Sequence, residues 1–281
     1  MSMIKHSDDP AILALYARLR DLEALSERGE MGVTPFLTPR ECIYAESYLQ
    51  PLLSQGCACL WGGHPAAERR RAVLLPSYVW GMATCVPGGS PAAALAEVGF
   101  DAAADEAEGL VTLLLVRGSG FRDLGHRDYL GSVLGLGLER DVLGDILVID
   151  PHSAYIFCKG EIAPFLLESL THVGSDPVKV KALPLDTPLA VEKKTQPIHD
   201  TVASPRLDCV VAALCNLARE RAQTAVRSGL VEVDYEVCQH CDLALTPPCV
   251  LSVRGVGKFS VLAFDGETRK GRMRLVAEKY V

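Results

Sequence analysis

The chain has 281 residues, of which 49% are hydrophobic and 22% charged, and its formal net charge is −7. This length suits two or three small domains of a soluble globular protein, and the longest apolar run, residues 110–116, is far short of the ~20 residues that cross a membrane. The first residues, MSMIKHSDDP, lack the apolar core of a signal peptide, so we expect a cytoplasmic protein whose ten cysteines are reduced thiols.

The N-terminal region is predicted to be a small α/β unit. Ser7-Asp8-Asp9-Pro10 favours a helix start, because short polar side chains accept hydrogen bonds from free backbone amides and proline fits the first turn. Thr38-Pro39-Arg40-Glu41 has the pattern of a capping box and opens a second helix, which we expect Pro51 to disturb. Strands are predicted at 58–61 and 72–75.

Three consecutive arginines, Arg69-Arg70-Arg71, follow a predicted turn at residues 62–65. Such a run is either a solvated connector or a set of contacts for RNA phosphates. The sequence by itself leaves both interpretations open.

The middle region alternates between apolar strands and amphipathic helices. Its order is typical of small α+β folds of the RRM-like and ferredoxin-like type. The aromatic stacking pair of a standard RRM is not visible, so we expect RNA contacts here to come from arginine and backbone groups. The predicted strands are 110–116, 145–149, 154–158 and 178–183, and the predicted helices are 126–136 and 162–170.

The C-terminal region begins with two short helices. Apolar residues recur at helical spacing from Val210 to Leu217 and again from Ala222 to Val226. Ser228-Gly229 then ends the second helix, because glycine accepts the left-handed conformation common at helix ends. Strands are expected at 230–233, 250–253, 258–264 and 272–276.

This helix–helix–turn–strand unit resembles the S4 RNA-binding domain of ribosomal protein S4 and of some pseudouridine synthases. Asp234 stands where that family usually has Asn, and Pro248-Cys249 stands where a Gly-Asp turn is usual. Within the motif we expect Asp208 to cap the first helix while Arg206 projects outward. The matching residues are Arg206-Leu207-Asp208, Leu214, Arg219, Ala222-Gln223, Arg227-Ser228-Gly229, Val231 and Val233.

The preceding part of the chain is similar to the YlmH family, bacterial proteins that end in an S4 domain. The resemblance implies association with the large ribosomal subunit, quality control of stalled nascent chains, a genetic link to cell division and a second RNA-binding unit in the middle. It rests on Thr38-Pro39-Arg40-Glu41, Gly62-Gly63-x-Pro65-x-Ala67-Glu68-Arg69, Phe121-Arg122-x-Leu124-x-His126-Arg127-Asp128-Tyr129-Leu130-Gly131, Leu134-Gly135-Leu136-Gly137-Leu138-x-Arg140 and Gly144-Asp145-Ile146.

We therefore predict an α+β protein with three parts and one linker. These are an N-terminal α/β unit (1–75), an RRM-like or ferredoxin-like middle domain (76–184), a linker (185–198) and an S4 domain (199–281). The resemblance implies a non-enzymatic, monomeric RNA-binding protein without cofactor or metal, whose partners are RNA of the large ribosomal subunit and peptidyl-tRNA. The predicted RNA-binding residues are Arg206, Asp208, Arg219, Gln223, Arg227, Ser228, Arg254, Lys258, Arg127 and Arg69.

The acidic net charge is unusual for an RNA-binding protein, since neutralised phosphates normally supply most of the affinity. Its distribution resolves part of this difficulty. Residues 97–108 carry five acidic and no basic side chains, whereas residues 251–274 carry six basic and two acidic ones. We therefore expect one basic face and an acidic remainder.

Three segments of the sequence partly match catalytic, nucleotide-binding or metal-binding motifs. Cys238 and Cys241 have a zinc-ligand spacing, but a second ligand pair is missing. His126-Arg127-Asp128 lacks the other protein-kinase signatures, and Gly118-x-Gly120 lacks the rest of a nucleotide-binding loop. For Arg127 an RNA contact and a structural ion-pair or cap cluster remain equally open. The alternatives to RNA binding alone are an RNA-modifying enzyme that uses the S4 unit for delivery, and an adaptor for cell division.

Overall fold

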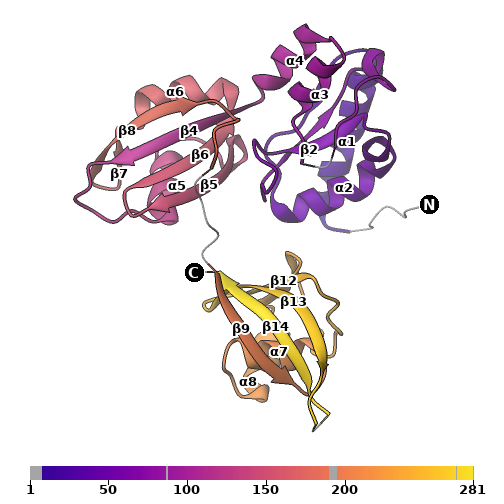
Figure 1. Ribbon diagram of the computed structural model, residues 1–281, viewed down its shortest axis with the longest axis vertical. Coiled ribbons are helices and arrows are strands. Elements are labelled where there is room, and N and C mark those ends of the chain that lie inside the picture. The colour runs from indigo at the N-terminus through magenta and orange to yellow at the C-terminus, as the bar shows by residue number, and fades with distance from the viewer. Residues whose placement is uncertain (1–7, 87, 190–194, 270, 281) are drawn as a thin grey trace. The chain divides into compact units, whose positions relative to one another are not determined.

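The computed structural model describes residues 8–86, 88–189, 195–269 and 271–280, which form two compact units, Met1–Val191 and Glu192–Val281 (Figure 1). Helices and antiparallel sheets occur in both units, which confirms the predicted α+β class. Ser7 of the predicted helix start, part of the predicted linker and Lys270 lie outside the described residues. Among the described helices, none is both long and apolar enough to cross a membrane.

The first unit opens with two helices packed on a three-stranded sheet. The helices are α1 (Pro10–Glu27) and α2 (Pro39–Ser54), and the sheet order is β1 (Gly32–Val33), β3 (Arg71–Leu74), β2 (Ala58–Trp61). The capping box is confirmed, since the backbone N–H of Glu41 donates to Thr38 Oγ1 at 3.2 Å and that of Thr38 donates to Glu41 Oε2 at 2.7 Å. The expectation that Pro51 disturbs α2 is wrong: Pro51 is exposed within its last turn, and the helix ends at Ser54.

The middle part of this unit has the element order β-α-β-β-α-β-β, in which the first strand after the second helix has two residues. Its five antiparallel strands lie in the order β5-β6-β4-β8-β7, and both longer helices cover one face through a core that includes Leu114, Val116, Tyr129 and Leu166. The elements are β4 (Val111–Gly118), α5 (His126–Gly135), β5 (Leu143–Asp150), β6 (Ser153–Lys159), α6 (Ala163–Ser169), β7 (His172–Val173) and β8 (Asp176–Leu183), with single 3₁₀ turns at Ser77–Val79, Arg140–Val142 and Gly160–Ile162.

The other face of this sheet joins the N-terminal part in one apolar core. Leu113 and Phe157 pack in the same cluster as Phe36 and Trp61, so the boundary predicted at 75/76 falls within a shared core. Two short helices that were not predicted, α3 (Pro91–Glu97) and α4 (Asp101–Glu108), contribute their alanines to this cluster. Their acidic side chains are the ones noted in the sequence.

The second unit is a six-stranded antiparallel sheet with two helices. The strand order is β11-β10-β12-β13-β14-β9, and Figure 1 shows β9 beside β14. Because β9 pairs with β14 from Thr195 onwards, the end of the segment predicted as linker belongs to this sheet. The elements are β9 (Thr195–Val202), α7 (Leu207–Leu214), α8 (Arg219–Arg227), β10 (Val231–Val233), β11 (Glu236–Val237), β12 (Cys249–Val253), β13 (Gly257–Glu267) and β14 (Met273–Tyr280).

A two-residue turn connects β10 and β11. Asp234 and Tyr235 have φ angles of 48° and 66°, the left-handed pair that a tight hairpin requires. Asparagine and aspartate are the side chains that adopt this conformation most readily, so aspartate at 234 preserves the turn. Asp234 Oδ1 also accepts the backbone N–H of Val250 at 2.8 Å, which fastens the hairpin to β12.

Replacing Asp234 by alanine is expected to destabilise the second unit by about 2 kcal/mol, because the left-handed conformation and the lost hydrogen bond each contribute about 1 kcal/mol. Asp234→Asn should leave stability within about 0.5 kcal/mol, since asparagine tolerates the conformation and keeps an acceptor. Differential scanning calorimetry of the whole chain measures both variants. Equal melting of Asp234→Ala and the parent would contradict this role of the turn.

Candidate nucleic-acid interface

A buried carboxylate organises the start of the two helices in the second unit. The Asp208 side chain in the first turn of α7 is fully buried. Arg206 Nε donates to its Oδ1 at 3.1 Å, whereas Arg219 Nη2 and Gln223 Nε2 donate to Oδ2 at 3.1 and 2.8 Å. Arg219 and Gln223 lie one turn apart on α8, so one face of α8 supplies both. Four of the predicted RNA-binding residues thus form a single cluster.

The charges of this cluster are held in fixed positions. Burial opposes ionisation of Asp208, but the hydrogen bonds from Gln223, Arg206 and Arg219 hold its pKa well below the ordinary value. The carboxylate in turn raises the pKa of Arg206. The Arg206 and Arg219 side chains remain 39% and 54% exposed. The buried Asp208 carboxylate therefore fixes the orientation of both guanidinium groups while they still face solvent. Such oriented forks suit bidentate contacts with phosphate.

Asp208 does not cap α7, which corrects the role expected for it. The N-cap position is Arg206, and within the described part of the chain no side chain caps this helix. Backbone carbonyls from the segment 241–245 take that role instead. The N–H groups of Leu207 and Asp208 donate to the carbonyls of Leu243 and Cys241 at 2.8 and 3.1 Å, which satisfies amides that a helix start leaves open.

The cysteines near this segment lie in a structural loop. Cys241 Sγ donates to the carbonyl of Gln223 at 3.6 Å, and Cys238 Sγ donates to that of His240 at 3.8 Å. Across the residues that the structure describes, no three His, Cys, Asp or Glu side chains come together as a metal site.

The remaining predicted residues of the second unit lie at the far end of α8 and in the following hairpin. Arg227 is the last residue of α8, Ser228 follows it, and both are exposed. Arg254 is exposed, and its backbone N–H donates to the Leu230 carbonyl at 2.9 Å, which places it beside this helix end. Arg219 and Arg227 are eight residues apart, so the basic positions extend over about 12 Å of helix.

Lys258 is half-buried among aromatic side chains on β13. Its Nζ lies 3.2 Å from the Tyr235 hydroxyl and 5.0 and 5.2 Å from the ring centres of Tyr235 and Tyr280. These contacts fix the position of the ammonium group on the sheet.

The two predicted residues of the first unit have different surroundings. Arg127 is exposed in the first turn of α5, where Asp128 accepts the Gly125 N–H at 2.8 Å and thereby caps the helix. Arg69 is only 9% exposed, and its guanidinium donates to the carbonyls of Leu143, Arg140 and Phe36 at 3.0, 3.1 and 3.3 Å. Burial also lowers the pKa of Arg69. We therefore assign Arg69 to the internal architecture and not to an RNA-binding surface.

The other two arginines of the triplet are likewise engaged within the unit. Arg71 donates to the carbonyls of Thr34 and Leu110 at 2.7 and 2.6 Å, and burial lowers its pKa to about 10. Arg70 forms a 2.8 Å ion pair with Glu46. The triplet is therefore not a solvated connector, because each arginine bonds to a segment distant in the sequence.

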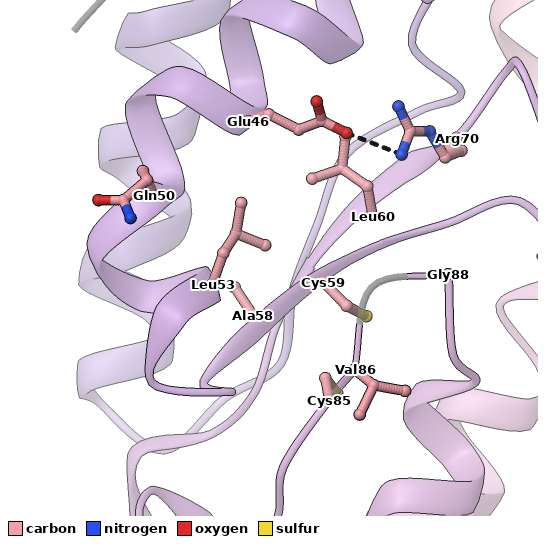
Figure 2. Close-up of a pocket in the computed structure, with 10 residues that line it drawn as sticks. All are labelled: Glu46, Gln50, Leu53, Ala58, Cys59, Leu60, Arg70, Cys85, Val86 and Gly88. Carbon is pink, nitrogen blue, oxygen red and sulfur yellow. Dashed lines mark ion pairs between the residues drawn. The ribbon is translucent and has the colours of Figure 1, made fainter. Parts of the chain in front are cut away.

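The Glu46–Arg70 pair borders a pocket of about 370 Å³ (Figure 2). Figure 2 shows this ion pair on one side of the pocket and Cys85 and Val86 on the other. The remaining lining residues are Gln50, Leu53, Ala58, Cys59, Leu60 and Gly88. With a largely apolar lining and its arginine already paired, this pocket is a poorer site for phosphate than the Asp208 cluster.

Phe121 is an exposed aromatic residue that lies outside the predicted set of RNA-binding residues. Phe121 exposes 94% of its surface in the loop between β4 and α5. Phe121 lies between Gly120 and Arg122, and an apolar side chain in such a loop has little to pack against. This sequence context could have identified Phe121 as an exposed aromatic residue.

Comparison with known proteins gives a family model, a sequence relative and a solved structure that resemble this chain. Residues 110–187, which span the β4–β8 sheet, match the family model for the RNA-binding domain in YlmH. The ribosome-associated protein quality control protein P2 of Bacillus subtilis (strain 168) is 29% identical over 256 residues, which cover 91% of this chain and 90% of that protein. The structure of cell division protein ylmH from Streptococcus pneumoniae covers 66% of this chain and 98% of its own, with 19% identity and a TM-score of 0.47.

Proposed function

Because the chain belongs to the YlmH family of RNA-binding proteins, we propose that it docks on structured RNA of the large ribosomal subunit during quality control of stalled nascent chains. The relative from Bacillus subtilis, which aligns with nine-tenths of the chain, supports the ribosomal setting. A ribosomal partner would place the protein in the cytoplasm. Peptidyl-tRNA held on the subunit is the second RNA partner in this proposal.

The observation that carries the proposal is the pair of oriented arginines at Asp208. The helix–helix–strand order of the second unit supports an S4-type domain. The order of the middle part of the first unit, β-α-β-β-α-β with the two-residue strand β7 added before β8, supports a ferredoxin-like middle domain. The charge distribution also favours the second unit as the principal RNA-binding part. It has thirteen basic and eleven acidic residues, against fifteen and twenty-four in the first unit.

The geometry of Asp208 favours binding over catalysis. The triplet Arg206-Leu207-Asp208 also resembles a motif in the catalytic domains of pseudouridine synthases, separate from their S4 domains, where the aspartate acts as a nucleophile. Here the carboxylate is fully buried behind two guanidinium groups and accepts their hydrogen bonds, so it has no path to a substrate. We therefore propose a non-enzymatic role.

The test is co-sedimentation of the purified chain with large ribosomal subunits. Arg206→Ala combined with Arg219→Ala should abolish it, because both phosphate-binding forks are removed. Arg221→Ala is a matched control on the same helix: it is exposed and lies two residues from Arg219, hence on another side of α8.

If about four phosphates are neutralised, the affinity of the parent should fall roughly a hundredfold between ~50 and ~200 mM salt. Unchanged sedimentation of the double variant would reject the proposal.

A further inference from the structure

Two cysteines lie together in the wall of the pocket that the Glu46–Arg70 ion pair borders. Cys59 comes from β2 and Cys85 from the loop that precedes α3, and both line the pocket as free thiols (Figure 2). They belong to the same apolar core and are 2% and 4% exposed. The backbone N–H of Cys85 donates to the Gly56 carbonyl at 3.1 Å, which holds the loop against the start of β2.

The two thiols interact with each other, and this interaction makes them chemically different. Their mutual hydrogen bond lowers the pKa of Cys85 and, together with burial, raises the pKa of Cys59. Cys85 is therefore the thiol of the pair that ionises more readily, with the Cys59 S–H as its donor. A thiolate beside a second thiol is the arrangement in which oxidation ends in a disulfide.

Two other buried cysteines of the first unit have plainer surroundings. Cys42 and Cys158 each donate to a backbone carbonyl at 3.8 Å. Burial raises their pKa to about 11 and about 12, so both stay protonated. Such thiols behave as small apolar side chains, whereas the contact between Cys59 and Cys85 gives that pair a reaction of its own.

The pair is within reach of a small reagent. Thr84 and Val86, on either side of Cys85, are exposed, Val86 to 59%. The pocket that both cysteines line has a volume of about 370 Å³, which is enough for a small molecule. Because Arg70 is paired with Glu46, an uncharged reagent enters without breaking an ion pair.

We propose that Cys59 and Cys85 form a reversible dithiol–disulfide pair that low-molecular-weight disulfides oxidise, with Cys85 as the attacking and Cys59 as the resolving thiol. The Cys85 thiolate attacks one sulfur of the small disulfide, which gives a mixed disulfide and releases one small thiol. The Cys59 thiolate then attacks the Cys85 sulfur and releases the second small thiol. The protein loses two hydrogens, and the small disulfide is reduced to two thiols.

This reaction is independent of the proposed RNA binding. Disulfides in the cytoplasm are usually transient and serve redox sensing or catalysis. The disulfide would join the loop that carries Cys85 covalently to β2 across the wall of the pocket. The pair is therefore a redox-sensitive site of the first unit.

The experiment treats the folded full chain with hydroxyethyl disulfide, an uncharged probe, and alkylates the remaining thiols after unfolding. Peptide mapping by mass spectrometry should find Cys59 linked to Cys85, with neither sulfur carrying the probe. Dithiothreitol should restore both thiols. Absence of this link in the parent chain would overturn the inference, and that outcome requires no variant to fold.

Single replacements separate the roles of the two thiols. In Cys59→Ala, Cys85 should keep the hydroxyethylthio group, because no neighbouring thiol resolves the mixed disulfide. In Cys85→Ala, Cys59 should react with the probe at least about tenfold more slowly than Cys85 does in Cys59→Ala. Equal reaction of the two sulfurs would contradict the assignment of the attacking thiol.

Cys57→Ala is the matched control, because Cys57 is buried like Cys59 and lies two residues before it. The Cys59–Cys85 link should form in this variant as in the parent. Its loss in Cys57→Ala, or a Cys57–Cys85 link in the parent, would show that the wrong pair has been assigned. Ribosome co-sedimentation tests the proposed function separately.

Discussion

Replacing Asp145 by alanine is expected to lower the free energy of unfolding of the first unit by about 3 kcal/mol, because it removes the acceptor from a buried polar junction. Asp145 is 11% exposed. Its carboxylate accepts the backbone N–H groups of Glu68 and Arg69 at 2.8 and 3.0 Å and lies 3.4 Å from His64 Nε2. Without it, two partly buried backbone amides lose their hydrogen-bond acceptor.

The measurement is urea unfolding followed by tryptophan fluorescence. Both tryptophans of the chain, Trp61 and Trp80, lie in the first unit, so their signal reports this unit alone. Asp186→Ala is the control: Asp186 is exposed, and its loss should change the unfolding free energy by less than about 0.5 kcal/mol. Unfolding of Asp145→Ala at the parent's urea midpoint would show that the junction contributes nothing.

The same junction should give an acid-sensitive contribution to stability. Burial opposes ionisation of Asp145, but the His64 imidazole 3.4 Å away and hydrogen bonds from two backbone amides hold its pKa below the ordinary value. As pH falls, the unfolded chain therefore binds this proton first. The contribution should be complete near neutral pH, decrease below about pH 4 and be absent in Asp145→Ala.

Local features of the fold were predictable from the sequence because their causes are local. The capping box at Thr38 and Glu41 needs four consecutive residues, and the left-handed stop of α8 needs one glycine, whose φ is 68°. By contrast, α3 and α4 were missed because alanine-rich segments with scattered acids show no clear apolar face. They are held by burial of those alanines against strands far away in the sequence.

The roles of charged residues were harder to predict, since they depend on contacts between distant segments. Arg69 had the sequence context of a surface arginine, yet Leu143 and Phe36 surround it. The family motif that contains Gly144 and Asp145 marks the same junction: a side chain at Gly144 would come within 2.8 Å of the Phe36 ring. The sequence motif identified Gly144 and Asp145, and their close packing in the structure gives the reason for these residue types.

At the candidate RNA-binding surface, the sequence indicated the participants but not their arrangement. Arg219 and Gln223 are four residues apart, so a shared helix face was predictable. That both reach Asp208, eleven and fifteen residues earlier, depends on how α7 packs against α8. The buried carboxylate changes the interpretation of the motif, because removing the arginines must now affect folding as well as binding.

The combined replacement of Arg206 and Arg219 by alanine is therefore expected to loosen α7. It would leave the Asp208 carboxylate buried with Gln223 as its remaining side-chain donor in the cluster, and an uncompensated buried charge is strongly destabilising. Hydrogen–deuterium exchange of the α7 amides should become at least about tenfold faster than in the parent. In Arg221→Ala it should stay unchanged.

Adding Asp208→Asn to that double variant should restore slow exchange, because a neutral amide no longer requires a cation and still accepts from Gln223. Ribosome co-sedimentation should nevertheless stay lost, since the phosphate-binding forks are absent. The triple variant thereby separates the two roles of the arginines. Recovery of both properties would mean that the double variant had failed to bind through unfolding alone, whereas recovery of folding without binding assigns Arg206 and Arg219 to the RNA contact.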